Sequence, residues 1–295
     1  MKKLNKYLIA IISMFVSFSA CASSLNETIE ETRSTDGETV YASPKELSNR
    51  VVAHRGGSME DGCPDNSIEA LRYTIGLGCY ASECDIYITK DEKVVVAHGV
   101  KDKINGLYPW EATYAELVQA GKLTNGETLP LLEDYLKVIL ESGTTRLWID
   151  VKTITNGGDM SDEYSSRAIE KASEIIRTMK AKNFVEVIVG KLAVFRRALV
   201  ASKGEWKCAY MNASWTPEQF ANAGYTWANF EVSASFYHNG KVGGKYTIEE
   251  YTQKGIRVSV YNVDTDDDRT WYAAKKEQLY AICTNYPKAL LKALK

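Results

Sequence analysis

The feature that most constrains the fold is a regular alternation of short apolar runs and longer segments with helical periodicity. From about residue 47 onward, most β-branched runs are followed by a segment whose apolar residues recur every three to four positions. Such alternation indicates a parallel sheet whose crossovers are helices. Roughly eight units across roughly 250 residues predict an α/β fold closed into a single TIM (β/α)8 barrel. The predicted strands are 50–54, 79–88, 93–97, 146–151, 185–189, 207–211, 227–232, 257–263 and 280–284.

An open, doubly wound sheet is the alternative architecture. That fold typically carries a glycine-rich phosphate loop directly after its first strand. Gly56-Gly57 follow the first predicted strand, but Ser58-Met59-Glu60 come next. This spacing matches neither a dinucleotide-binding loop nor a P-loop. The sequence therefore favours the barrel.

The chain ahead of the barrel has two parts of different composition. Residues 1–22 place three lysines before an apolar stretch that is short for a membrane span of ~20 residues. This pattern is typical of an export signal. Residues 23–46 are polar and acidic, which predicts a flexible tether to a barrel that occupies 47–295. We therefore expect an exported bacterial protein of the periplasm or the outer surface.

Two ways of processing the signal remain open. Ala20-Cys21-Ala22 suits ordinary cleavage before Ser23. Phe18-Ser19-Ala20-Cys21 resembles a lipobox, in which Cys21 becomes the lipidated first residue, although Leu is usual in place of Phe18. We favour the lipoprotein, so membrane contact is expected only through a lipid anchor at Cys21.

Charge argues against one class of partner. The chain holds 36 Lys and Arg against 38 Asp and Glu, for a formal net charge of −2. It contains no basic run and no interleaving of basic with aromatic residues. Nothing in the sequence therefore indicates binding to nucleic acid.

Carboxylates stand at the ends of two predicted strands. Glu83 and Asp85 lie two residues apart, so their side chains share one face of the strand, and Asp150 ends a later strand. In a barrel these strand ends meet at one pole, where active groups lie. Carboxylates gathered there repel one another unless a positive charge lies between them. Three carboxylates and water suit a hard divalent cation, Mg²⁺ or Ca²⁺.

Cations and histidines fall at the same pole. Arg55 follows the first strand, and Lys152 lies two residues after Asp150, so both are placed to bind an anion such as a phosphate. His54 closes the first strand, and His98 follows the apolar run 94–97. Two histidines can act as general base and general acid on opposite sides of a displacement. With the cation, these groups describe metal-assisted cleavage of a phosphodiester.

Several motifs carry a family resemblance. In chain order, they are His54-Arg55-Gly56, Pro64-Asp65-Asn66-Ser67, Glu83-x-Asp85, Val94-Val95-x-x-His98 and Leu129-Pro130-x-Leu132-x-x-x-Leu136. With these motifs the sequence resembles the glycerophosphodiester phosphodiesterases, and the similarity is weaker at 258–263 and 282–287. The resemblance implies a TIM barrel that hydrolyses small glycerophosphodiesters to glycerol phosphate and an alcohol. The implied roles are metal ligands at Glu83, Asp85 and Asp150, acid and base at His54 and His98, and phosphate contacts from Arg55 and Lys152.

The chain departs from the family pattern at four positions. Asp65 and Asp150 stand where the family usually has Glu. Tyr261 replaces a Trp on the seventh strand, and Asn285 replaces the Asp of a final Thr-Asp pair. The residues of the His54–His98 stretch otherwise follow the pattern.

Two other functions fit parts of the same sequence. A phospholipase of the sphingomyelinase D type uses a similar barrel, two histidines and a metal set that Asp150 suits well. The segment 129–136 and the helix start at Asn66-Ser67 fit the first family better. A non-catalytic barrel that binds a polyol phosphate is compatible with Asp65, Asp150 and Asn285. The two histidines and the complete carboxylate set argue against it.

Overall fold

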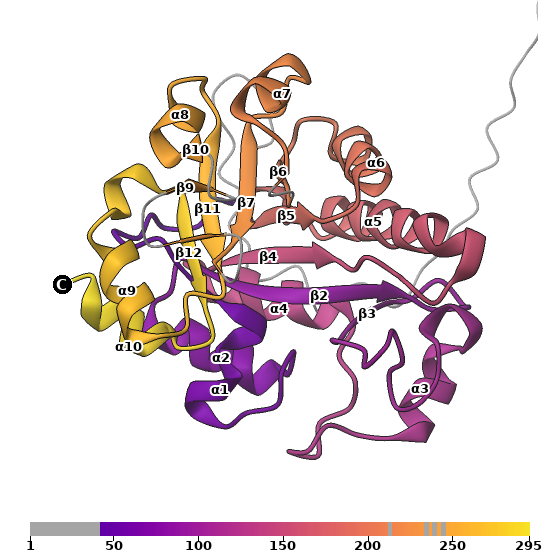
Figure 1. The fold of residues 1–295 in the computed structure, drawn as a ribbon. Coiled ribbons are helices and arrows are strands. Elements are labelled where there is room, and N and C mark those ends of the chain that lie inside the picture. The colour runs from indigo at the N-terminus through magenta and orange to yellow at the C-terminus, as the bar shows by residue number, and fades with distance from the viewer. Residues whose placement is uncertain (1–41, 212–213, 233–235, 238–240, 243–245) are drawn as a thin grey trace, which may run out of the picture. The chain divides into compact units, whose positions relative to one another are not determined.

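Eight parallel strands close into a barrel, because β1 (Val51–Ala53) pairs with both β2 (Ala81–Ile88) and β12 (Ala281–Thr284) (Figure 1). The structure is a computed structural model, and it describes residues 42–211, 214–232, 236–237, 241–242 and 246–295. The predicted barrel is confirmed. The other barrel strands are β4 (Arg146–Val151), β5 (Val185–Val189), β6 (Lys207–Tyr210), β7 (Trp227–Glu231) and β11 (Arg257–Tyr261).

Helices surround the barrel (Figure 1). Three of them begin with the same capping box: the hydroxyl of Thr113, Thr216 or Thr247 accepts from a backbone N–H three residues on, and a Glu or Gln there bonds back. The helices are α1 (Ser58–Asp61), α2 (Ile68–Leu77), α3 (Tyr114–Ala120), α4 (Leu132–Ser142), α5 (Ser161–Thr178), α6 (Leu192–Ser202), α7 (Pro217–Asn222), α8 (Ile248–Thr252), α9 (Asp266–Ala273) and α10 (Pro287–Ala293). None of the helices in the described ranges is long and apolar enough to cross a membrane.

The predicted signal segment, including Cys21, and most of the predicted tether lie outside the described residues. The described end of the tether contacts the barrel. The backbone N–H of Lys45 donates to the carbonyl of Gly143 at 2.8 Å, and Glu46 pairs with Arg146 at 2.7 Å.

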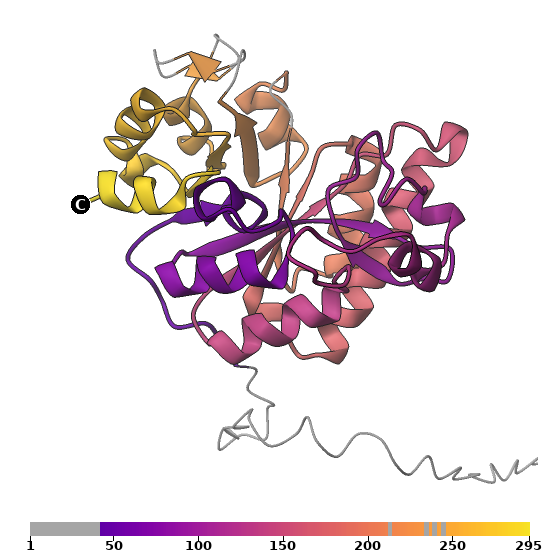
Figure 2. The same ribbon diagram turned by 90° about the horizontal axis from the view of Figure 1, so that it is seen from below.

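The strand predicted at 93–97 has a different role from the other eight. It forms β3 (Val94–Val96), which pairs antiparallel with β2 through Ile86 and Val96 and stays outside the barrel. The prediction that His98 ends a barrel strand is therefore wrong. The physical reason is that a run of apolar residues looks the same whether its strand pairs parallel or antiparallel with a neighbour. Figure 2 shows β3 and α3 on the side of the barrel away from the yellow C-terminal helices.

Alternation along the strands decides which side chains enter the barrel. Val52, Ala81, Trp148 and Cys283 pack together inside it, and alternate residues on a strand share a face. Residues two positions further along the strands therefore continue the interior face toward its C-terminal end. A smaller sheet beyond the barrel joins β8 (Phe236–Tyr237), β9 (Lys241–Val242) and β10 (Tyr246–Thr247).

Candidate active site

Three carboxylates gather at the C-terminal end of the barrel, as the strand ends predicted. Asp85 and Asp150 are direct partners in the register of β2 and β4, and Glu83 lies two residues before Asp85. One carboxylate oxygen from each of the three lies within 4.8 Å of the others. Glu83 is 2% exposed and Asp85 is 1% exposed.

Burial sets the electrostatics of this carboxylate cluster. Desolvation, reinforced by repulsion from Asp85 and Asp150, raises the pKa of Glu83 well above its usual range. Desolvation also raises the pKa of Asp150 to about 6, although Lys152 opposes the shift. Full ionisation of the cluster would therefore place more negative charge there than its surroundings stabilise. Such oxygen donors fit a hard divalent cation.

Two cations line the same end of the barrel. The Lys152 ammonium lies 3.0 Å from Asp85 Oδ1 and 3.1 Å from Asp150 Oδ2. The Arg55 guanidinium lies 3.3 Å from Asp85 Oδ2 and donates to Asp65 Oδ2 at 3.0 Å. Asp65, the shortened carboxylate of the sequence motif, thus holds the arginine side chain.

The backbone at Arg55 adopts an unusual conformation. Its φ is 49°, in the left-handed region that non-glycine residues rarely enter. This turn directs the Arg55 N–H to Glu83 Oε2 at 2.8 Å, while the side chain reaches Asp85. Gly56 follows with φ 87°, and a Cβ there would meet Ala70 Cβ at 2.6 Å. The motif therefore requires glycine at 56.

Asn66 is a site residue to which the sequence assigned no role. Its side chain donates to Asp85 Oδ2 at 2.9 Å and accepts from the Asp85 backbone N–H at 3.0 Å. Its φ is 58°, and the next residue, Ser67, caps α2. An Asn directly before a capping Ser is the only local signal of this role, since Asn tolerates the left-handed conformation.

His54 lies beside the carboxylates in the turn after β1. Its Nδ1 lies 2.8 Å from Asn285 Oδ1, and its Nε2 lies 3.9 Å from Glu83 Oε2. Desolvation and then repulsion by Arg55 lower the pKa of His54. The imidazole is therefore favoured in its neutral form.

His98 reaches the same region by a different route. Because Ile86 pairs with Val96, the chain after β3 runs beside Asp85, whose carbonyl accepts from the Ala97 N–H at 3.0 Å. The side chain is exposed at the rim, and it makes no hydrogen bond within the described part of the chain. Desolvation lowers the pKa of His98, whereas the charge of Asp85 opposes this shift.

A cavity of about 340 Å³ opens beside these groups. Ile188, Met211 and Tyr261 contribute apolar surface to its lining. Strand alternation could have placed the first two, since both continue the interior face of their strands. The lining residues are His54, Arg55, Glu83, Asp150, Lys152, Thr153, Ile188, Gly190, Met211, Tyr261, Asn262 and Cys283. His98 and Asp85 are not among them.

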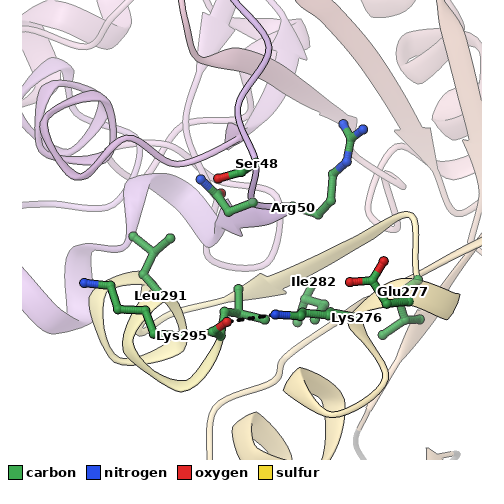
Figure 3. A pocket seen from close by; sticks show the side chains of 10 residues that line it. Ser48, Arg50, Lys276, Glu277, Ile282, Leu291 and Lys295 are labelled. Atoms are coloured by element: carbon green, nitrogen blue, oxygen red, sulfur yellow. Dashed lines mark hydrogen bonds between the residues drawn. The ribbon is translucent and has the colours of Figure 1, made fainter.

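A cavity of about 610 Å³ lies at the opposite end of the strands, between the approach to β1 and α10 (Figure 3). Its lining includes the basic residues Arg50, Lys276 and Lys295 and the apolar residues Leu291 and Ile282. The Lys276 ammonium donates to the carbonyl of Leu294 at 2.9 Å. This larger cavity is lined by neither the carboxylate cluster nor a histidine. We therefore place the candidate active site at the smaller cavity.

Comparison with known proteins agrees with this geometry. The sequence pattern of the glycerophosphoryl diester phosphodiesterase family matches residues 54–289, which include every predicted site residue. The chain belongs to this family. Its resemblance to the family at the motifs is thereby confirmed.

Individual relatives are distant. A glycerophosphodiester phosphodiesterase of Bacillus altitudinis is 27% identical over 113 residues, which cover 35% of this chain and 45% of that protein. A crystal structure of a glycerophosphodiester phosphodiesterase from Parabacteroides distasonis superposes with a TM-score of 0.71 at 24% identity, covering 85% and 98% of the two chains. An Oleispira antarctica phosphodiesterase in complex with the product sn-glycerol-3-phosphate gives 0.64 at 17% identity, covering 83% and 96%. The two structures show the shared fold.

Proposed function

We propose that this family member hydrolyses glycerophosphodiesters to glycerol phosphate and an alcohol, with the help of one divalent cation. The observation that carries the proposal is the buried cluster of Glu83, Asp85 and Asp150 beside a cavity that Arg55 and Lys152 also line. A phosphodiester carries one negative charge, which these two cations are placed to bind. The product named for the Oleispira relative is consistent with such a substrate.

Glu83, Asp85 and Asp150 would hold the cation, Mg²⁺ or Ca²⁺. When bound, it would supply stabilisation of the charge that develops on the phosphoryl oxygens. Arg55 and Lys152 orient the phosphate toward the histidines. Asp65 and Asn66 keep Arg55 and Asp85 in place through the hydrogen bonds described above.

His54 and His98 move the protons. One histidine takes the proton of the attacking water as its oxygen bonds to phosphorus. Where a substrate hydroxyl attacks instead, the product is a cyclic diester, which water opens to glycerol phosphate in a second displacement. The other gives a proton to the alcohol oxygen as the bond from phosphorus to that oxygen breaks. General acid–base catalysis of this kind contributes about 10²- to 10⁴-fold to the rate.

Activity assays with defined metals and substrates test this proposal. The chain without residues 1–22 should release glycerol phosphate from glycerophosphocholine when Mg²⁺ or Ca²⁺ is present, and release should stop when the ion is chelated.

His54→Ala and His98→Ala should each lower kcat at least about 100-fold. Lys152→Ala should raise KM, whereas Lys276→Ala, at the opposite pole, serves as the matched control. Full activity of the double histidine variant would refute the proposal.

The same assays separate the alternatives. Choline released from sphingomyelin in preference to water-soluble diesters would favour a sphingomyelinase D-type phospholipase. Metal-independent binding of glycerol phosphate without turnover would favour a non-catalytic barrel. The three gathered carboxylates, and a cavity lined by Glu83, Asp150, Arg55, Lys152 and His54, support the hydrolase instead.

We further propose that the protein is exported and held at the membrane by a lipid on Cys21. Support comes from the basic and apolar pattern of residues 1–22 and from the acidic stretch that follows. Cys21→Ser should move the protein from the membrane fraction to the soluble exported fraction. Equal membrane retention of both forms would contradict the anchor.

A further inference from the structure

Three side chains form a line of hydrogen bonds that leads away from the cavity. His54 Nδ1 lies 2.8 Å from Asn285 Oδ1, and Asn285 Nδ2 lies 2.6 Å from Asp264 Oδ2. The three residues follow different barrel strands, namely β1, β12 and β11. Neither Asn285 nor Asp264 lines the cavity, and their line of hydrogen bonds reaches it through His54.

The direction of each hydrogen bond follows from what Asp264 accepts. Its Oδ1 accepts from the Asn285 backbone N–H at 2.8 Å and from the Thr284 hydroxyl at 3.2 Å. A carboxylate only accepts, so the Asn285 amide must present its NH₂ end to Asp264. Its carbonyl oxygen consequently faces His54. Because that oxygen also only accepts, the His54 Nδ1 carries a proton.

A neutral imidazole protonated at Nδ1 has its lone pair at Nε2. In this protein Nε2 points toward Glu83 and the cavity, opposite the Asn285 contact. His98, by contrast, has no hydrogen bond within the described residues that would fix its tautomer.

We propose that Asp264 and Asn285 are positioning residues that fix the Nδ1-protonated tautomer of His54 and so make His54 the proton acceptor. The proposal rests on the proposed function and assigns the roles that it leaves open. The nucleophile oxygen bonds to phosphorus and passes its proton to His54 Nε2. The bond from phosphorus to the alcohol oxygen breaks, and His98 gives its proton to that oxygen.

The pair also accounts for one departure from the family pattern. A carboxylate in place of the Asn285 amide would turn an oxygen toward Asp264 Oδ2, where the amide nitrogen now lies at 2.6 Å. Two ionised carboxylates at such a distance repel strongly. The amide of Asn285 and the carboxylate of Asp264 therefore form a matched pair, in which the charge lies one residue further from His54.

Exchanging the two groups tests the pair. In Asp264→Asn, two amide nitrogens would face each other unless Asn285 turns over, which would present its NH₂ end to His54. In Asn285→Asp, two carboxylates would face each other. The double variant Asp264→Asn/Asn285→Asp again pairs each donor with an acceptor, because the new amide at position 264 can donate to the new carboxylate at position 285 and still accept from the backbone N–H. It also keeps an accepting oxygen beside His54.

We expect each single variant to lower kcat about 10- to 100-fold, with KM changed by less than about threefold. The double variant should recover to within about fivefold of the wild type. Asp267→Asn, an exposed change on α9, is the matched control and should leave kcat unchanged. A double variant as slow as the slower single variant, or single variants as fast as the wild type, would overturn the proposal.

A second measurement does not depend on the folding of the exchange variants. Nitrogen-15 NMR of the wild-type protein should show His54 protonated at Nδ1, with the signal assigned by its loss in His54→Gln. A resonance typical of the Nε2-protonated tautomer would overturn the positioning roles. Absence of turnover by the wild type would instead refute the proposed function, so the two failures are distinguishable.

Discussion

At the residue scale, the site depends on side chains that hold the charged groups and do not enter the cavity. Asn66 is the clearest case. It is 1% exposed, it bonds both the carboxylate and the backbone of Asp85, and its backbone is left-handed. A substitution there changes two things at once, namely the support of Asp85 and the conformational free energy of the backbone.

Replacing Asn66 with Gly or with Ala separates these two effects. Both variants lose the hydrogen bonds to Asp85, which leaves a buried carboxylate less satisfied at a cost of about 1–3 kcal/mol. Ala also costs about 1–2 kcal/mol for a left-handed backbone that Gly adopts freely. Asn66→Ala should therefore unfold at lower denaturant than Asn66→Gly, while both lose affinity for the divalent cation. Equal stability of the two variants in urea titrations would contradict the backbone argument.

At the scale of elements, the path of β3 brings His98 to the site. The antiparallel register against β2 returns the chain to the level of Asp85. The loop that follows is fastened to the loop after β4, because Asp102 Oδ2 accepts from the backbone N–H groups of Thr155 and Asn156, each at 2.9 Å. The two loops on either side of the carboxylates are thus joined by one buried side chain.

The sequence predicts the elements of this region but not their directions. Apolar runs look alike in parallel and antiparallel strands, so the run before His98 fits a barrel strand as well as it fits β3. The groups inside the barrel were predictable because alternation along a strand fixes the face of Glu83, Asp85 and Asp150. The partner of His54 was not predictable, since Asn285 lies 231 residues away on a different strand end. No sequence pattern around Asp264 marks it as a residue of the site.

At the scale of the whole molecule, the two ends of the barrel are finished differently. At the N-terminal end, buried Glu186 accepts from Trp148 Nε1 at 2.7 Å and from the Tyr80 hydroxyl at 3.1 Å, so its charge is satisfied by the protein. At the C-terminal end, the pKa values of Glu83 and Asp150 are raised, and their charges are not fully satisfied. The N-terminal end of the barrel is therefore stabilised by its hydrogen bonds, whereas the carboxylates at the C-terminal end lower stability and form a binding site.

This imbalance predicts how pH affects the metal-free protein. Burial raises the pKa of Asp150 to about 6 in the folded state, against about 3.9 when unfolded. Between these values the folded chain binds more protons, so its stability falls as pH rises from about 4 to about 6. The loss from Asp150 is up to about 3 kcal/mol, and the raised pKa of Glu83 acts in the same direction. Asp85 is buried, but Lys152 and Arg55 outweigh its desolvation and lower its pKa, so it stays ionised across this window.

A divalent cation should reverse the loss, because it binds the carboxylates only after their protons leave. The increase in Tm on adding Mg²⁺ or Ca²⁺ should therefore be larger at pH 7.5 than at pH 5. Asp150→Asn should raise the Tm of the metal-free protein at pH 7.5 and abolish most of the metal-dependent increase, whereas Asp267→Asn should do neither. A metal-dependent increase that is equal at both pH values would mean that protons and the cation do not compete for these carboxylates. The cluster would then be a buried group of mutually repelling carboxylates and would not be the cation site.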